Sequence, residues 1–195
     1  WAGGGHTHAI CPLESINLRG AHNRLNVLAA CAIAGAAGAD PPAMAAAIAA
    51  FTGVPHRLEP VAVKNGVTYI NDSIATSPER LIAALNAFAE PIILLAGGKD
   101  KDLPWDSAAR LILRRVKILL LFGQAQDLIL KAVKAERTAS HRLKIISCRT
   151  LEQAVAQAQQ LAQPGDVVLL SPGGTSYDAY PDFAARGEHF KALVG

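Results

Sequence analysis

Three short polar segments carry residue types that could bind a charged ligand, and each directly follows an apolar run. Residues 71–79 read NDSIATSPE, residues 97–101 read GGKDK, and residues 171–176 read SPGGTS. These segments offer hydroxyls, lysines, a carboxylate and backbone N–H groups that glycine leaves accessible. Such groups can hydrogen-bond ribose hydroxyls, carboxylates or phosphates. The three segments are therefore the candidate ligand-binding parts of the chain.

Each segment also has a simpler structural interpretation. Ser77 with Pro78 in the first turn is typical of a helix start, and capping alone would explain it. Residues 97–101 are equally consistent with a solvated charged loop. Asp72 is harder to explain, because it lies between a strand end and the cap, where a carboxylate can accept from ribose or help hold a metal. Residues 171–176 lack the GxxxxGKS/T spacing of a Walker loop.

The elements that must position these segments alternate between strands and helices after residue 55. Asn65 and Gly66 separate the β-rich runs 61–63 and 67–70, and so predict a hairpin. The apolar patterns predict further strands at 92–96, 118–122, 143–146 and 167–170, and helices at 78–88, 105–114, 125–135, 151–161 and 180–193. They predict an α/β fold: a Rossmann-like, doubly wound, mostly parallel sheet entered by a β-hairpin. In such a sheet ligands bind beyond the carboxyl ends of the strands, where the three segments fall.

The residues before this domain have a different composition. Residues 23–51 are rich in alanine and predict two packed helices, 23–37 and 41–51, with Asp40 as a cap and proline in the first turn. The glycine-rich residues 3–6 follow no apolar strand and predict a turn. Gly53 and Pro55 then interrupt the pattern. We expect two domains, residues 1–54 and residues 55–195.

Composition excludes several functional classes. Aromatic residues make up 5% of the chain and the net charge is +3, so no basic and aromatic surface for nucleic acid is expected. The three cysteines have no CxxC spacing, which argues against disulfides or a zinc site and favours a cytoplasmic location. No signal-peptide pattern is present, and the longest apolar stretch, residues 43–51, is too short to cross a bilayer.

Five motifs in order resemble the Mur ligases of peptidoglycan synthesis. Residues 20–26 resemble their GxHNxxN segment, and residues 55–59 their linker into the C-terminal domain. Residues 71–76, 169–178 and 182–190 are similar to the NDSKATN, LLSPAxASxD and FxxRGxxF segments of the members that add D-glutamate. Other Mur ligases and the folylpolyglutamate synthases usually carry a different segment at 71–76. The resemblance therefore favours the D-glutamate-adding branch.

The resemblance implies roles for individual residues. The residues that match ATP contacts are Asn23, Asn26, Arg57 and Asp72. The residues that match the glutamate pocket are Thr76, Lys101, Ser176, Tyr177 and Phe183. One position departs, because Ile74 stands where these ligases usually have lysine. Ile74 supplies no charge, so part of the anchoring is expected to shift to Lys99 or Arg80.

The resemblance also implies an activity and its cofactors. It implies an ATP-dependent amide ligase that adds D-glutamate to UDP-N-acetylmuramoyl-L-alanine in the cytoplasm, acting as a monomer through an acyl phosphate with Mg²⁺. Residues 1–54 would be the end of a central ATP-binding domain, and residues 55–195 the C-terminal domain. The Walker lysine and most Mg²⁺ ligands would lie upstream of residue 1. We therefore expect no metal ligand or catalytic residue in this chain, and no ligation by it alone.

Several other functions stay open. The chain could belong to a ligase that uses L-glutamate, to a ligase similar to folylpolyglutamate synthase, or to a non-catalytic module that binds glutamate or nucleotide. A dehydrogenase fragment is a poor alternative, because the first strand of the α/β region is not followed by GxGxxG.

Overall fold

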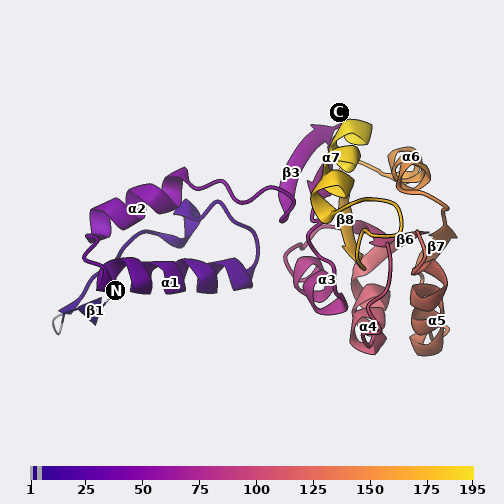
Figure 1. The fold of residues 1–195 in the computed structure, drawn as a ribbon, viewed down its shortest axis with the longest axis horizontal. Helices are drawn as coiled ribbons and strands as arrows, with labels where there is room; N and C mark the ends of the chain where they lie inside the picture. Colours follow the sequence, from indigo (N-terminus) through magenta and orange to yellow (C-terminus); the bar gives the residue numbers. More distant parts are fainter. Residues whose placement is uncertain (1, 4–5) are drawn as a thin grey trace. The chain divides into compact units, whose positions relative to one another are not determined.

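Residues 2–3 and 6–195 are described by a computed structural model, in which the chain divides into two units, Trp1–Val54 and Pro55–Gly195 (Figure 1). Short strands β1 (Ala2–Gly3) and β2 (His6–Thr7) pair antiparallel near the start of the first unit. The turn expected at residues 3–6 has its central residues, 4 and 5, outside the described part of the chain.

The first unit is mainly two helices, as the alanine-rich segment predicted. A 3₁₀ turn, η1 (Leu13–Ser15), precedes α1 (Ala21–Ala36) and α2 (Pro41–Ala50). The predicted cap is confirmed, since Asp40 Oδ1 accepts from the backbone N–H of Ala43 at 2.8 Å.

A six-stranded sheet organises the second unit. Its strands are β3 (Glu59–Lys64), β4 (Val67–Asn71), β5 (Ile92–Gly97), β6 (Val116–Phe122), β7 (Lys144–Ser147) and β8 (Val167–Gly173). Their spatial order is β3-β4-β8-β5-β6-β7, with β3 antiparallel to β4 and every other pair parallel. The predicted mostly parallel sheet entered by a hairpin is confirmed.

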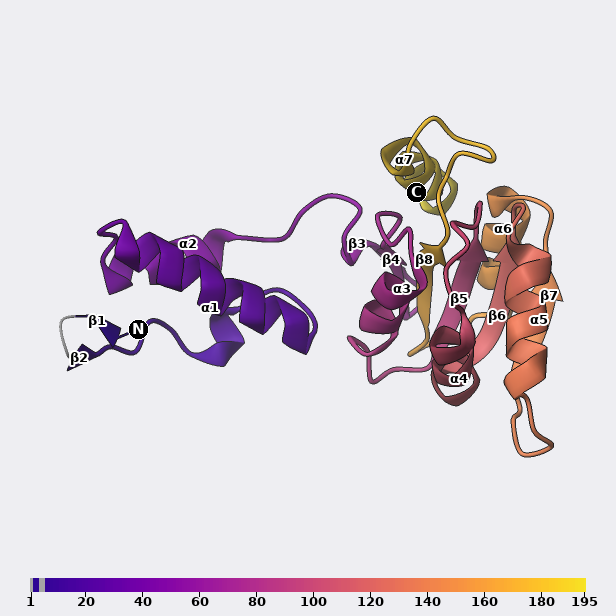
Figure 2. The ribbon, with the colours of Figure 1, turned by 60° about the horizontal axis from the view of Figure 1, so that its bottom comes forward.

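Helices cover both faces of this sheet (Figures 1 and 2). They are α3 (Pro78–Leu85), α4 (Asp106–Arg115), α5 (Gln126–Glu136), α6 (Leu151–Leu161) and α7 (Phe183–Val194). Alternate residues of β5 enter different cores: Ile92 and Leu94 pack with α3, α4 and α5, while Ile93 and Leu95 pack with α6 and α7. Burial on both faces explains the continuous apolar strands.

Local sequence signals account for most element boundaries, and predicted ends differ from observed ones by three residues or fewer. The hairpin turns at Asn65 and Gly66, whose φ angles are 51° and 75°. Two details differ from expectation. Ser77 occupies the N-cap position of α3 but its side chain makes no capping hydrogen bond. The last helix begins at Phe183 rather than near residue 180, because Asp182 caps it through the N–H of Ala185 at 2.7 Å.

None of the helices in the described ranges combines the length and hydropathy that crossing a membrane requires.

Candidate functional site

Three loops at the carboxyl ends of neighbouring strands are joined to one another by backbone hydrogen bonds. They are the β4 loop (residues 72–77), the β5 loop (98–105) and the β8 loop (174–182). Gly173, at the end of β8, donates to the carbonyl of Ala75 at 2.8 Å. Lys99 and Thr175 exchange two backbone hydrogen bonds of 2.9 and 2.7 Å. The three polar segments singled out in the sequence therefore meet at one edge of the sheet, where open α/β sheets bind ligands.

Glycine is required where the β5 loop passes the β8 loop. Gly98 has φ of 89°, and a Cβ atom there would lie 2.1 Å from the carbonyl oxygen of Thr175. The same atom would lie 2.8 Å from Nη1 of Arg186. Only a residue without a side chain allows both the positive φ and this close approach.

Arg186, on the first turn of α7, ties two of these loops together. Its side chain is fully buried. Nε donates to the Ser73 hydroxyl at 3.0 Å and Nη2 to the Ser73 carbonyl at 2.9 Å. Nη1 donates to the carbonyls of Gly174 and Thr175 at 3.2 and 3.0 Å. The guanidinium therefore clamps the β4 loop to the β8 loop.

Among the described residues, the charge of this clamp is balanced by dipoles rather than by a direct ion pair. The guanidinium hydrogen bonds of Arg186 end on carbonyl and hydroxyl oxygens of Ser73, Gly174 and Thr175. Burial lowers the pKa of Arg186 to about 10, an effect opposed by the charge of Asp178. Arg186 stays protonated near neutral pH and places a positive charge under the loops, which favours an anionic ligand there.

Asp72 is held inside the protein rather than presented to solvent. Oδ1 accepts from the backbone N–H of Leu58 at 3.1 Å, and Oδ2 accepts from the Ser171 hydroxyl at 2.8 Å. Burial raises the pKa of Asp72 to about 7, although both hydrogen bonds and the charges of Arg57 and Arg80 act to lower it. Asp72 thus links the entry of the domain to β8, in addition to any role toward ATP.

A second buried polar group lies beside it. The amide nitrogen of Asn71 lies 3.0 Å from both His56 Nδ1 and Glu59 Oε2. Asn71 Oδ1 accepts from the N–H of Ser73 at 3.1 Å, which fixes the orientation of the amide. His56 is buried in the left-handed region, with φ of 64°. The segment that enters the domain is therefore bonded to the start of the β4 loop.

The residues expected in a glutamate pocket lie on these loops or, for Phe183, at the start of α7. Lys101 Nζ donates to the Thr76 hydroxyl at 3.3 Å, so the structure brings these two side chains together. Ser176 is buried and Tyr177 is exposed, on the β8 loop. Phe183 begins α7, and its carbonyl accepts from the Ser73 hydroxyl at 2.8 Å.

The residues expected to contact ATP fall in both units. Arg57 is exposed and, like Asp72, belongs to the second unit. Asn23 and Asn26 lie on α1, and the amide of Asn26 donates to Asn23 Oδ1 at 3.2 Å. The amide nitrogen of Asn23 donates to the Arg19 carbonyl at 2.7 Å. Asn26 also lines an apolar pocket of about 370 Å³ between α1, α2 and residues 16–18.

The residues proposed to replace the missing lysine are placed differently. Arg80 Nη1 donates to the carbonyl of Ile74 at 3.0 Å, so its charge lies beside the β4 loop. Lys99 is exposed, and its backbone forms the bridge to Thr175.

Within the described ranges, no three His, Cys, Asp or Glu residues are grouped to hold a metal ion.

Comparison with known proteins agrees with this architecture. The sequence profile described as "Mur ligase, glutamate ligase domain" matches residues 56–174. The chain belongs to the Mur ligase family. The family resemblance read from the motifs is therefore confirmed.

Curated relatives extend the similarity to the first unit. The UDP-N-acetylmuramoylalanine–D-glutamate ligase of Symbiobacterium thermophilum is 46% identical over 194 residues, which are 100% of this chain and 42% of that protein. The ligase of the same name from Pelotomaculum thermopropionicum is 42% identical over 190 residues, 97% of this chain and 41% of that protein. The chain thus spans about two fifths of the length of these relatives.

Solved structures share the fold at low identity. The UDP-N-acetylmuramate-alanine ligase MurC of Thermotoga maritima matches 91% of this chain, and 38% of its own, with a TM-score of 0.62 and 17% identity. A folylpolyglutamate synthase of Mycobacterium tuberculosis, complexed with ADP and AMPPCP, matches 89% of this chain, and 41% of its own, with a TM-score of 0.63 and 20% identity. At these identities, the similarities show a shared fold.

Proposed function

We propose that this chain is the amino-acid-binding part of a cytoplasmic ATP-dependent ligase that joins D-glutamate to UDP-N-acetylmuramoyl-L-alanine. The observation that carries the proposal is the set of three loops at the carboxyl edge of the sheet. In this member of the Mur ligase family, these loops carry Thr76, Lys101 and Ser176. Relatives named for this reaction, at 46% and 42% identity, support D-glutamate as the amino acid.

The proposed reaction proceeds through an acyl phosphate. A carboxylate oxygen of the muramoyl substrate bonds to the γ-phosphorus of ATP, and ADP leaves. The amine nitrogen of glutamate then bonds to the acyl carbon, the carbon–oxygen bond to phosphate breaks, and the nitrogen loses a proton. Mg²⁺ accompanies ATP in this scheme and would offset charge on the transferring phosphoryl group. We assign Mg²⁺ no ligand among the residues of this chain.

The residues of this chain would bind and orient the amino acid. Glutamate carries two carboxylates, which need a cation and fixed hydrogen-bond donors. Lys101 would pair with one carboxylate, with the Thr76 hydroxyl beside it. Ser176, Tyr177 and Phe183 would form the remaining wall, and the buried charge of Arg186 would favour an anion there. Such positioning lowers the barrier by holding the amine against the acyl carbon.

Nucleotide contacts would come from both units. We propose that Arg57 and Asp72 contact the ribose and phosphates and that Asn23 and Asn26 contact adenine. The Asp72 carboxylate already accepts hydrogen bonds from Leu58 and Ser171. Only its remaining lone pairs would therefore be available to accept from the nucleotide. The 195 residues contain no GxxxxGKS/T segment, so we expect phosphoryl transfer to need residues outside this chain.

The test is a phosphate-release assay on the longer ligase that carries this chain. We expect release with ATP, UDP-N-acetylmuramoyl-L-alanine and D-glutamate together, and none when any one is omitted. L-Glutamate and a folate substrate, tested under the same conditions, distinguish the alternative ligases. The 195-residue chain alone is expected to release no phosphate.

Two outcomes would contradict the proposal. Turnover with the folate substrate and none with the muramoyl substrate would assign the chain to a different ligase. Turnover with L-glutamate exceeding that with D-glutamate would keep the reaction class but overturn the stereochemistry.

A further inference from the structure

The β8 loop carries two of the proposed glutamate contacts, Ser176 and Tyr177, and its conformation must be held by something. Immediately after Ser176 the chain makes a tight turn, in which the Ser176 carbonyl accepts from the N–H groups of Ala179 and Tyr180 at 3.0 and 2.8 Å. A shift of Tyr180 therefore moves Ser176 through these two hydrogen bonds.

This turn packs against the core through Tyr180 and also borders a pocket. A cavity of about 190 Å³ lies against it and is lined by residues of the turn together with α6 and α7, including Asp178, Tyr180, Glu152 and His189. Directed polar contacts therefore act together with packing to hold the turn.

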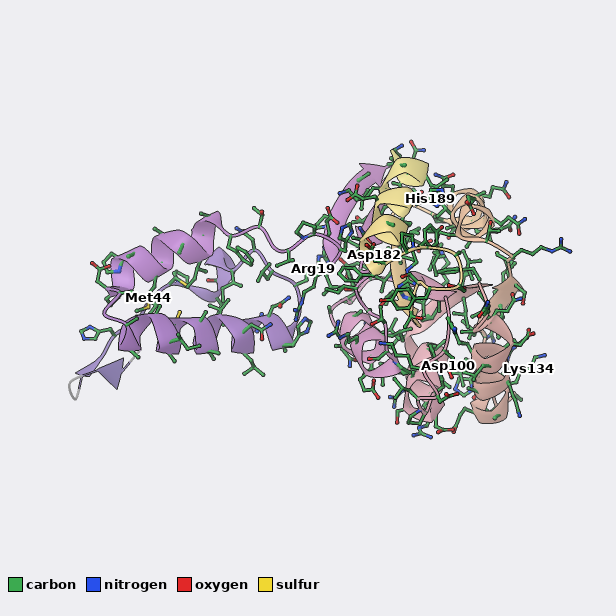
Figure 3. All side chains as sticks on the ribbon, in the orientation of Figure 1. Arg19, Met44, Asp100, Lys134, Asp182 and His189 are labelled. Atoms are coloured by element: carbon green, nitrogen blue, oxygen red, sulfur yellow. The ribbon has the colours of Figure 1, made fainter. Side chains whose placement is uncertain are left out.

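Two such contacts are present. Asp178 Oδ2 accepts from the backbone N–H of Gln124, in the loop after β6, at 3.1 Å. The Tyr180 hydroxyl lies 2.8 Å from Nδ1 of His189, which projects from α7 (Figure 3). His189 Nε2 in turn lies 3.5 Å from Glu152 Oε1 on α6. A chain of three side chains thus connects the turn to two helices.

The surroundings of Tyr180 keep its hydroxyl able to donate a hydrogen bond. Burial, and next the carboxylate of Glu152, raise the pKa of Tyr180 to about 12, so the phenol keeps its proton and can donate it. The donor-capable Tyr180 hydroxyl thus faces Nδ1 of His189, while Nε2 of the same ring faces the Glu152 carboxylate.

We propose that Tyr180 and His189 are positioning residues for the amino acid: their hydrogen bond holds the turn of the β8 loop so that Ser176 and Tyr177 face the bound glutamate. The inference rests on the proposed function, because it assumes that glutamate binds at this loop. Neither side chain needs to touch the substrate. Loss of the hydrogen bond would loosen the turn and weaken glutamate binding selectively.

The test measures KM for glutamate, KM for ATP and kcat in the longer ligase. Tyr180→Phe deletes one hydroxyl and keeps the ring. His189→Leu removes the acceptor, whereas His189→Asn keeps one, since Asn Oδ1 can take the place of Nδ1. Tyr69→Phe, a buried tyrosine on β4, is the matched control. Combining Tyr180→Phe with His189→Leu completes a double-mutant cycle.

We expect KM for glutamate to rise about two- to tenfold in Tyr180→Phe and in His189→Leu, the effect of one net hydrogen bond. KM for ATP should stay within about twofold, His189→Asn should recover most of the loss, and the double variant should be no worse than either single one. Unchanged glutamate KM in Tyr180→Phe overturns the inference. So does an equal rise of both KM values with a lowered Tm, which indicates a general structural role. Wild-type ligase without glutamate-dependent turnover overturns the proposed function first, and this inference with it.

Discussion

The carboxyl edge of the sheet has an inner layer and an outer layer that are built differently. The inner layer consists of buried polar groups, Arg186, Asp72 and Ser73, whose side chains hydrogen-bond other parts of the protein. The outer layer consists of exposed groups, Lys101 and Tyr177, for which the structure shows few internal contacts. The inner groups hold the loops, and the outer groups remain available to a ligand.

This difference indicates where mutations should affect stability and where they should affect binding. A buried polar group that loses its partner costs about 1–3 kcal/mol, whereas exposed substitutions are usually within about 0.5 kcal/mol. Substitutions in the inner layer should therefore lower the free energy of unfolding of the domain. Substitutions in the outer layer should leave this free energy unchanged and weaken only ligand binding.

Arg186→Met should give the largest loss of stability. It removes the donors for the carbonyls of Ser73, Gly174 and Thr175, and we expect the free energy of unfolding to fall by roughly 4 kcal/mol. Urea unfolding followed by circular dichroism measures it. Arg114→Met, which removes an exposed arginine from α4, is the control and should change stability by less than about 0.5 kcal/mol. A loss below about 1 kcal/mol in Arg186→Met would show that the clamp is dispensable.

The fold could be predicted because its signals are local. Continuous apolar strands separated by amphipathic helices determine a sheet covered on both faces, and Asn65-Gly66 determines the hairpin. The edge that carries the loops follows from the rule for open α/β sheets.

The inner layer could not be predicted, because its contacts join residues far apart in the chain. Arginine on a helix is ordinarily exposed, so no local pattern predicts that Arg186 is buried. Its partners Ser73 and Gly174 lie 113 and 12 residues away in the sequence. Its place in the FxxRGxxF segment was the available signal. The position of Asp72 after a strand predicts that it accepts from ribose or helps hold a metal. Its bonds to Leu58 and Ser171 depend on the tertiary fold.

Asp72 predicts a pH dependence of stability. Its pKa is raised from 3.8 to about 7 in the folded protein, so the folded state keeps a proton that the unfolded chain loses above about pH 4. The stabilising contribution is therefore present below pH 4 and is lost as the pH rises to about 7. Asp72→Asn mimics the protonated form, so wild type should lose about 4 kcal/mol relative to this variant between pH 4 and pH 8. Parallel stability curves from urea titrations would contradict the raised pKa.

Gly98→Ala tests how tightly the β5 and β8 loops cross. The new methyl group would meet the Thr175 carbonyl at 2.1 Å, in addition to the cost of φ at 89°. Gly165→Ala is a matched control, because Gly165 has φ of 92° and nothing within 4 Å of the added atom. We expect Gly98→Ala to be less stable than Gly165→Ala by about 2 kcal/mol, which overpacking typically costs. Equal Tm values for the two variants would mean that the crossing adjusts freely.

Lys101→Met should have the smallest effect on stability and a clear effect on binding. Lys101 is exposed and its ammonium group donates to the Thr76 hydroxyl, so the free energy of unfolding should change by less than about 0.5 kcal/mol. If its ammonium group pairs with a carboxylate of glutamate, KM for glutamate should rise about tenfold or more, while KM for ATP stays within about twofold. Lys134→Met, on α5 (Figure 3), removes an exposed lysine outside the three loops and should change neither KM. A Lys101→Met variant with normal glutamate KM would remove Lys101 from the outer layer, and the cation facing the ligand would then have to be sought at Arg80, whose guanidinium reaches the Ile74 carbonyl.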